Sequence, residues 1–372
     1  MTWTDVAVII GSIFILINFI TVVVLVLTYV ERKFIARIQQ RLGPMRTGPW
    51  GLLQPVADAI KLLTKEDLLP GRANTLSYWM APIVVFTPSF ALWLTIPLTQ
   101  DIVVRNLEFG IFYILAVSGL SVAGLMMAGW GSFNKYAMLG AVRAAAQLVS
   151  YELPLIVSVL GVVMIAGSMD LTVIVQEQTT VWYIVLQPAA FVLFLMAGLA
   201  EVGRTPFDAP VAESEVVGGP FIEYSGMHWS MFSLAEYANT FAIAALTALL
   251  FLGGWRGPGP DSGWTQNVVQ AAWLVGKTMG VIFVMFWIRA SLPRLRIDQL
   301  MALAWKVLVP VSFASMMLTA VYLFYGWPDW TIAVMSLALL LGVTGSYYLR
   351  SGRWTASPVT TKLLVKKGRL MG

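Results

Sequence analysis

Cysteine is absent from the 372-residue chain, and histidine occurs once, at His228. A chain without cysteine forms no disulfide, no iron–sulfur cluster and no thiolate metal site. A single histidine also argues against a haem or a metal centre built from histidines. We interpret His228 as an ordinary interfacial residue rather than a ligand. Any redox centre that works with this chain must therefore lie on a partner protein or on a diffusible substrate.

Charged residues are scarce as well. They make up 12% of the chain, about half the share found in soluble proteins, whereas 58% of the residues are hydrophobic and the mean hydropathy is +0.78. This composition indicates an integral membrane protein. The net charge of +5 reflects Lys and Arg in loops and does not indicate nucleic-acid binding. Because the first basic residue is Arg32, the N-terminal apolar run lacks the charged start of a signal peptide and is expected to remain as the first span.

Long apolar runs dominate what is present. A transmembrane helix needs about 20 residues to cross ~30 Å of hydrocarbon. Nine runs approach this length, at about Asp5–Val30, Leu76–Leu98, Leu107–Trp130, Leu153–Gly167, Val181–Ala200, Phe232–Leu252, Ala271–Ser291, Ala304–Tyr325 and Trp330–Leu349. The fourth run is short, but the helix-favouring residues 136–151 allow it to extend towards the N-terminus. We predict an all-α polytopic membrane protein with about nine transmembrane helices.

The distribution of basic residues predicts the orientation of these spans. With the loop after the first span in the cytoplasm, 21 of the 24 Lys and Arg residues lie on the cytoplasmic side. By the positive-inside rule the N-terminus is outside and the C-terminus is in the cytoplasm. We expect one transmembrane domain over residues 1–349, followed by a basic cytoplasmic tail over 350–372 that contacts anionic lipid or a partner.

A first cytoplasmic segment predicts an amphipathic helix over about residues 51–65. Its apolar residues recur at helical spacing and its polar residues occupy the other face, which is typical of a helix lying at the membrane interface. The apolar set is Leu52, Leu53, Val56, Ile60 and Leu63, and the polar set is Gln54, Asp58, Lys61 and Lys65. On pattern alone, a membrane-surface anchor is the favoured interpretation.

A second cytoplasmic segment, the acidic insert over about residues 201–233, carries the strongest functional signal. The stretch from residue 199 to 239 contains one basic residue, Arg204, and six acids, namely Glu201, Asp208, Glu213, Glu215, Glu223 and Glu236. So few basic residues are unusual for a cytoplasmic loop, so we expect the insert to be buried against protein. Carboxylates at a bilayer edge are costly unless paired or hydrated, and by default they indicate a proton or ion path.

Structural roles remain open for some of these acids. Asp208 fits a capping box with Thr205, and Glu236 fits another with Ser233. However, Glu236 would then lie about one turn inside an apolar span, where an ionised side chain is expensive. Two further acids, Glu152 and Glu201, lie at or near membrane depth. Because burial and neighbouring carboxylates raise the pKa of a carboxylic acid towards neutrality, such a group can relay protons.

Motifs in the same order over about residues 10–325 then carry a family resemblance. They are Glu31-Arg32-Lys33, the segment from Gln40 to Asp67, the element from Arg143 to Glu152, the stretch from Ala200 to Asp208, and the stretch from Ile288 to Leu300. Together they resemble the quinone-chamber membrane subunit of respiratory complex I, the proton-pumping NADH:quinone oxidoreductase.

The resemblance implies a function in the bacterial inner membrane. The chain would form an access chamber for ubiquinone or menaquinone, with FMN and Fe–S clusters only on partner subunits, and it would contact membrane-arm and hydrophilic-arm subunits. Chamber residues implied by position are Arg32, Arg37, Arg41, Asp58, Arg204, Arg289 and Arg294. The implied proton relay comprises Glu152, Glu201, Asp208, Glu213, Glu215 and Glu236. Without the resemblance, topology and headgroup contact would explain the Arg residues.

One departure and two alternatives accompany this interpretation. Val211 stands where the family usually carries an acid, so the number of carboxylates that the relay needs is open. The homologous membrane subunit of energy-converting hydrogenases has the acids but no quinone, and the complete segment from Gln40 to Asp67 favours the quinone version. A cation transporter would be supported by matching broken helices in two halves of the chain, and we find no such symmetry.

Overall fold

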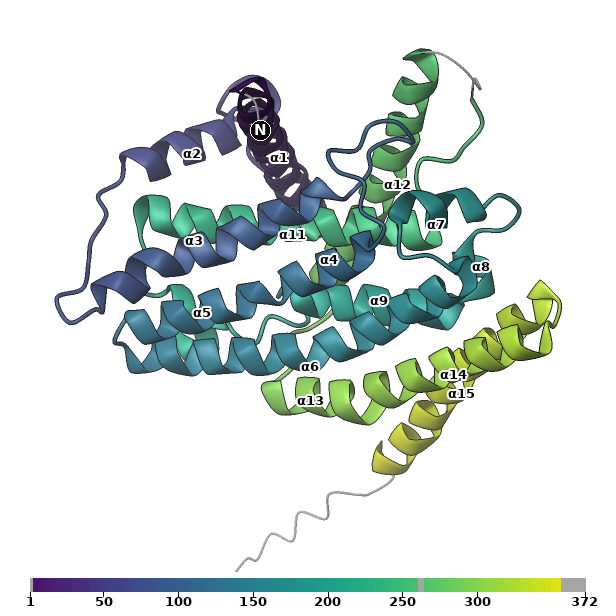
Figure 1. Cartoon of the computed structure of the whole chain (residues 1–372). Helices are drawn as coiled ribbons and strands as arrows, with labels where there is room; N and C mark the ends of the chain where they lie inside the picture. The colour runs from purple at the N-terminus through teal and green to yellow at the C-terminus, as the bar shows by residue number, and fades with distance from the viewer. Residues whose placement is uncertain (1–2, 260–263, 356–372) are drawn as a thin grey trace, which may run out of the picture.

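The computed structural model describes residues 3–259 and 264–355 (Figure 1). Side chains are described for these ranges apart from residues 3–10, 213–214 and 347–355. Every regular element within the described ranges is helical, which confirms the predicted fold class. Most of the predicted basic tail, residues 356–372, lies outside the described residues.

The elements follow one another along the chain as long helices separated by short ones. They are α1 (Trp3–Ile38), η1 (Pro49–Gly51), α2 (Gln54–Thr64), α3 (Thr75–Ala91), η2 (Leu92–Leu94), α4 (Gly110–Ser118), α5 (Leu120–Gly131), α6 (Lys135–Ala166), α7 (Leu171–Glu177), α8 (Tyr183–Leu186), α9 (Pro188–Glu201), α10 (Glu213–Val216), η3 (Gly219–Phe221), α11 (Gly226–Phe251), α12 (Trp264–Ser291), α13 (Ile297–Leu303), the π-helical η4 (Ala304–Leu308), α14 (Val309–Tyr325) and α15 (Asp329–Thr355).

Among the described residues, eight helical segments are long and apolar enough to cross a membrane. They correspond to the predicted runs except the fifth, where Pro188 begins a separate helix after α8. Helix α9 has 14 residues and is about 21 Å long at ~1.5 Å per residue, which is shorter than the hydrocarbon core. The predicted extension of the fourth run is confirmed, because α6 begins at Lys135, where the side chain of Asn134 accepts a hydrogen bond from the amide of Tyr136.

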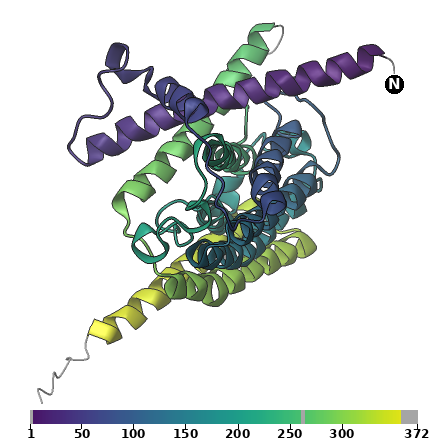
Figure 2. The same cartoon turned by 90° about the vertical axis from the view of Figure 1, so that its left-hand side faces the viewer.

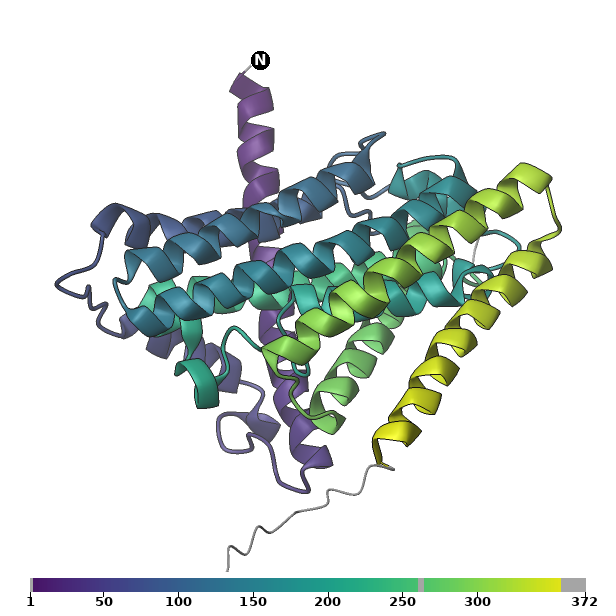
Figure 3. The same ribbon diagram turned by 90° about the horizontal axis from the view of Figure 1, so that it is seen from below.

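The central helices α3, α5, α6, α9 and α11 lie side by side, with α14 packed on the face of α6 (Figure 1). Helices α1 and α12 cross this bundle steeply, which Figure 2 shows by looking almost along the bundle. Figure 3 shows α15 reaching down beside α14. Helix α11 is the most enclosed of the spans, because 78% of its most apolar 18-residue stretch is buried inside the protein. Any polar group on α11 therefore needs a partner or water inside the protein.

A glycine contact fixes the acidic insert against the bundle. A Cβ atom built on Gly140 of α6 would lie 2.4 Å from the Cα of Gly219 in η3. Gly219 itself adopts a φ of +59°, in the left-handed region that favours glycine. The backbone of the insert therefore lies directly on α6, which leaves no room for a side chain between them.

Candidate functional site: a carboxylate-lined cavity

Hydrogen bonds from neighbouring helices hold the start of the acidic insert in place. The side-chain amide of Gln147 on α6 donates to the carbonyl oxygens of Ala200 at 2.7 Å and Phe207 at 2.6 Å. From the other side, the amide of Leu295 donates to the carbonyl of Pro206 at 3.1 Å. Several insert residues are buried, among them Phe207. The insert therefore packs against protein, as we predicted from its having a single basic residue.

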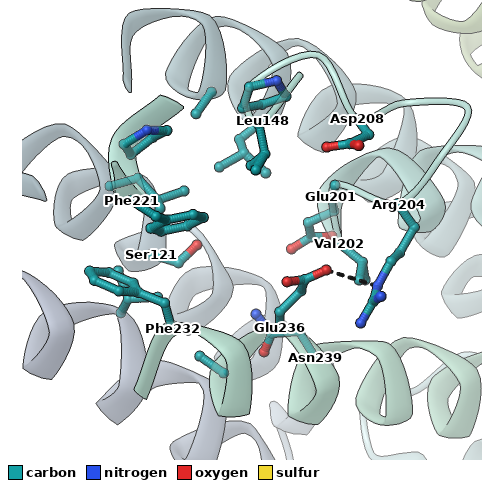
Figure 4. Close-up of a pocket in the computed structure, with 18 of the residues that line it drawn as sticks. Ser121, Leu148, Glu201, Val202, Arg204, Asp208, Phe221, Phe232, Glu236 and Asn239 are labelled. Atoms are coloured by element: carbon teal, nitrogen blue, oxygen red, sulfur yellow. Dashed lines mark ion pairs between the residues drawn. The ribbon is translucent and has the colours of Figure 1, made fainter. Parts of the chain in front are cut away.

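A cavity of about 360 Å³ lies between this insert and helices α5, α6 and α11. Three of the predicted relay acids line it, namely Glu201, Asp208 and Glu236. In Figure 4 the carboxylates of Glu201 and Glu236 lie next to each other, and Asp208 lies above them. Apolar side chains, including Phe232, form the opposite wall. Acids from a helix end, a loop and a second helix thus share one enclosed space.

Glu236 combines depth in the protein with access to this cavity. It projects from the most enclosed helix, yet 39% of its side-chain surface is accessible, and its carboxylate lies 2.9 Å from Nε of Arg204. Pairing with Arg204 and access to the cavity both reduce the cost of placing this carboxylate inside the protein. The capping interpretation is wrong, because α11 begins at Gly226, well before Ser233.

Asp208 also has a different role from the helix cap that the sequence allowed. The structure describes turns and no helix at residues 204–209, so the capping interpretation is wrong here too. The Asp208 carboxylate instead pairs with the guanidinium of Arg294 at 2.6 Å. Burial raises the pKa of Asp208 above its ordinary value of 3.8, although Arg294, Arg289 and Arg204 oppose that shift.

A buried ion cluster lies beside the cavity and contains a residue that the site prediction missed. Glu31, in the C-terminal part of α1, is 3% exposed and pairs with Arg204 at 3.3 Å and with Arg289. Burial by itself lowers the pKa of the Arg204 guanidinium, but Glu236 and Glu31 raise it on balance above its ordinary value. The Tyr237 ring lies 4.3 Å from the guanidinium carbon and adds a cation–π contact. Arg204 therefore stays charged and is shared between two carboxylates.

Glu152 lies beyond the large cavity, at the break between α4 and α5. A Cβ atom built on Gly119 would meet a carboxylate oxygen of Glu152 at 2.9 Å, so the acid approaches this backbone closely. Ser118, the residue before this glycine, lines a second, smaller cavity together with Glu201 and Asn239. Four of the six predicted relay acids therefore lie in or beside one continuous region of the protein.

The remaining predicted site residues lie elsewhere. Glu215 forms an ion pair with Arg143 at 2.6 Å, outside the large cavity, and the side chain of Glu213 lies outside the described residues. Arg32 and Asp58 pair at 2.5 Å between α1 and α2. Arg37 and Arg41 are exposed near the end of α1. The predicted chamber residues thus form two groups, one around the large cavity and one at the exposed junction of α1 and α2.

The single histidine does not belong to the cavity. His228 is buried near the start of α11, with Nδ1 2.5 Å from a carboxylate oxygen of Asp67. The ring of Trp79 packs edge-on against the imidazole, with 4.3 Å between the ring centroids. These contacts tie the segment after α2, and helix α3, to α11.

These observations define an all-helical polytopic membrane protein that encloses a charged, carboxylate-lined cavity. Residues 11–320 match the family model for NADH dehydrogenase. The chain is 46% identical over 332 residues to the NADH-quinone oxidoreductase subunit designated H of Dehalococcoides mccartyi, which covers 88% of this chain and 91% of that protein. It is 51% identical over 292 residues to the protein of the same designation from Geobacillus kaustophilus, and this match covers 78% of this chain and 86% of that protein. The chain belongs to this family of NADH-quinone oxidoreductase membrane subunits.

Proposed function

We propose that this chain is the quinone-chamber subunit of a bacterial proton-translocating NADH:quinone oxidoreductase and that its carboxylates link quinone reduction to proton movement. The observation that carries the proposal is the cavity shared by Glu201 at the end of α9, Asp208 in the loop after it, and Glu236 on α11. Acids that share a hydrated cavity respond to each other's charge, because a neighbouring carboxylate disfavours ionisation. A change of charge at one end of the group thus alters proton occupancy at the other.

The exposed group of residues supports the quinone part of the proposal. Arg32 and Asp58 join the end of α1 to α2, and Arg37 and Arg41 extend the same basic surface. The predicted apolar face of α2 is exposed as well, at Leu52, Leu53, Val56, Ile60 and Leu63. We infer that lipid and hydrophilic-arm subunits cover this surface and complete a chamber that admits ubiquinone or menaquinone.

Proton movement would begin at the Asp208–Arg294 pair and the shared Arg204. Partner subunits would supply the electrons from FMN and Fe–S clusters, and reduction of the quinone to the quinol takes up two protons. New negative charge near Arg204 would weaken its hold on Glu236, and Glu236 would then gain a proton from the cavity. Glu201 and Glu152 would pass the change on towards other membrane-arm subunits. Glu213 and Glu215 would belong to the cytoplasmic side of this relay.

The orientation inferred from basic residues fits this assignment. We place the N-terminus outside and the acidic insert, residues 201–233, at the cytoplasmic face of a single transmembrane domain over residues 1–349. The basic tail, residues 350–372, would also be cytoplasmic. The bacterial inner membrane is the expected location.

The test uses membranes that carry the assembled enzyme with Glu236→Gln or Asp58→Asn. Quinone reduction with NADH and proton translocation are measured together after assembly has been checked. We expect Glu236→Gln to reduce coupled proton translocation at least tenfold and Asp58→Asn to reduce quinone reduction at least threefold. Asp101→Asn, which removes an exposed loop carboxylate that does not line the cavity and does not belong to α1 or α2, is the matched control. If both test variants assemble and behave like this control, the proposed function is wrong.

A further inference from the structure

Helix α2 buries little of its own surface in this chain. Pro55 is the buried residue among the eleven that form the helix, and apolar side chains such as Ile60 and Leu63 are exposed. In Figure 1 the helix lies at the edge of the molecule, apart from the central helices. Packing of an apolar face is what usually holds a helix in place, so α2 depends on other contacts. One of them is the pair of Asp58 with Arg32 of α1.

A second set of contacts holds the chain that leaves α2. Residues 65–68, which follow α2, pack against residues 223–228, where the acidic insert enters α11, and we call this contact the clasp. The hydroxyl of Ser225 donates to the carbonyl of Glu66 at 3.3 Å and accepts from the amide of Leu68 at 3.4 Å. The clasp therefore joins the end of α2 to the start of α11 through backbone groups on one side.

His228 and Asp67 form the polar centre of the clasp. The side chain of His228 is 9% exposed, and its Nδ1 lies 2.5 Å from Oδ2 of Asp67. The rings of Trp79 and Tyr78 pack against the imidazole, with centroids at 4.3 and 5.9 Å. These aromatic contacts fix the direction of the imidazole, because the ring is enclosed by α3. The histidine can thus hold Asp67, and with it the chain after α2, in one position.

The clasp connects the two groups of predicted site residues. Helix α2 carries Asp58 of the exposed group, and α11 carries Glu236 of the large cavity. Glu236 follows His228 by about two helical turns on α11. The position of α2 is therefore set from the same rigid, enclosed helix that carries a cavity acid.

We propose that the contact between His228 and Asp67 positions α2 for quinone binding, so that both are positioning residues for quinone reduction. When the clasp opens, α2 leaves the position that completes the chamber in a fraction of the molecules. If only a fraction of the molecules can bind, the apparent affinity falls by that fraction, whereas the bound complex reacts as before. Loss of the clasp thus acts on KM for the quinone and not on kcat. This inference rests on the proposed function.

The test uses His228→Phe, which keeps a ring against Trp79 without nitrogen atoms, and Asp67→Ala, which removes the carboxylate. Reduction of decylubiquinone by NADH is measured over a range of quinone concentrations in membranes that carry the assembled enzyme. We expect each variant to raise KM for the quinone at least threefold and to keep kcat within twofold of the parent. The matched control is Tyr322→Phe, which removes a 2.6 Å hydrogen bond from α14 to Asp329 of α15 and should leave KM unchanged.

Two further variants distinguish a positioning contact from general destabilisation. Because His228 and Asp67 act through one contact, the double variant should raise KM no more than the larger single effect. Asp67→Asn keeps an oxygen that accepts from the imidazole, so it should recover part of the affinity lost in Asp67→Ala. Hydrogen exchange of the amides of residues 54–68 should accelerate at least tenfold in His228→Phe, since α2 is then held less firmly.

Several results would overturn the proposal. Less assembled complex with a parent-like KM would make the clasp a static brace, and additive effects in the double variant would show that the two residues act separately. If the clasp variants keep the parent KM while Asp58→Asn still slows quinone reduction, the proposed function survives and only the positioning role is wrong. If Asp58→Asn also matches the Asp101→Asn control, the quinone part of the proposed function has failed.

Discussion

The buried carboxylate of Glu31 offers the sharpest test of how the cavity is held together. It is 3% exposed and pairs with two guanidinium groups, those of Arg204 and Arg289. Replacing it by Gln keeps the shape of the side chain but removes its charge. Arg204 then keeps one carboxylate partner, Glu236, whereas Arg289 loses its partner in this cluster.

The expected cost follows from the burial of these groups. Removing one partner of a buried ion pair typically destabilises a protein by about 3–5 kcal/mol, because a buried charge is left uncompensated. Gln still offers an oxygen that accepts a hydrogen bond, so the lower end, about 3 kcal/mol, is the better expectation. If the cluster opens before the transition state for unfolding, this energy corresponds to an acceleration of about 150-fold.

Thermal inactivation is the appropriate assay, since large assemblies usually unfold irreversibly and their stability is then a rate. Solubilised complexes carrying the parent chain, Glu31→Gln or the control Asp101→Asn are held at one elevated temperature, and the half-life of quinone reduction is recorded. We expect the half-life of Glu31→Gln to shorten at least tenfold, while the control changes less than twofold. Equal half-lives for Glu31→Gln and the control would refute the argument that this cluster is a buried, mutually dependent network.

Three further predictions concern the insert. Because burial raises its pKa, Asp208 keeps its proton above pH 3.8 in the folded state. This contribution to stability falls as pH rises through the folded pKa. Between pH 4 and 7 the inactivation rate of the parent should therefore increase with pH, whereas the rate of Asp208→Asn should lack this dependence. Gly140→Ala should reduce assembled complex in membranes severalfold, because the new Cβ would lie 2.4 Å from Gly219 Cα. Arg143→Gln should alter thermal stability by at most about 1 kcal/mol, since its pair with Glu215 is partly exposed.

Much of the fold was predictable because apolar runs and their lengths encode membrane spans. The extension of α6 could be predicted because the side chains before Glu152 favour a helix. The short α9 could not be predicted from hydropathy alone, because the run from Val181 to Ala200 is apolar apart from Gln187. Pro188 marks the separate start of α9, and its effect depends on how the preceding residues pack.

The candidate site was predictable where charge alone carries the signal. Glu201 and Glu236 interrupt apolar sequence, so their cost indicated a proton or ion path. The structure places both carboxylates at one cavity. Glu31 was missed because it adjoins Arg32 and Lys33 and reads as part of a charged helix end. Only the tertiary structure shows that it turns inward to meet Arg204.

The net charge of the ion cluster depends on whether Glu236 is ionised. Two guanidinium groups, Arg204 and Arg289, face two carboxylates, Glu31 and Glu236, so the cluster is neutral while both acids are ionised. A proton on Glu236 leaves one uncompensated positive charge, which favours negative charge on the nearby acids. Val211 lines the same cavity, and an ionised acid at that position would offset this positive charge. Because Val211 is neutral, Glu201, Asp208 and Glu236 are the carboxylates that line this cavity among the described residues.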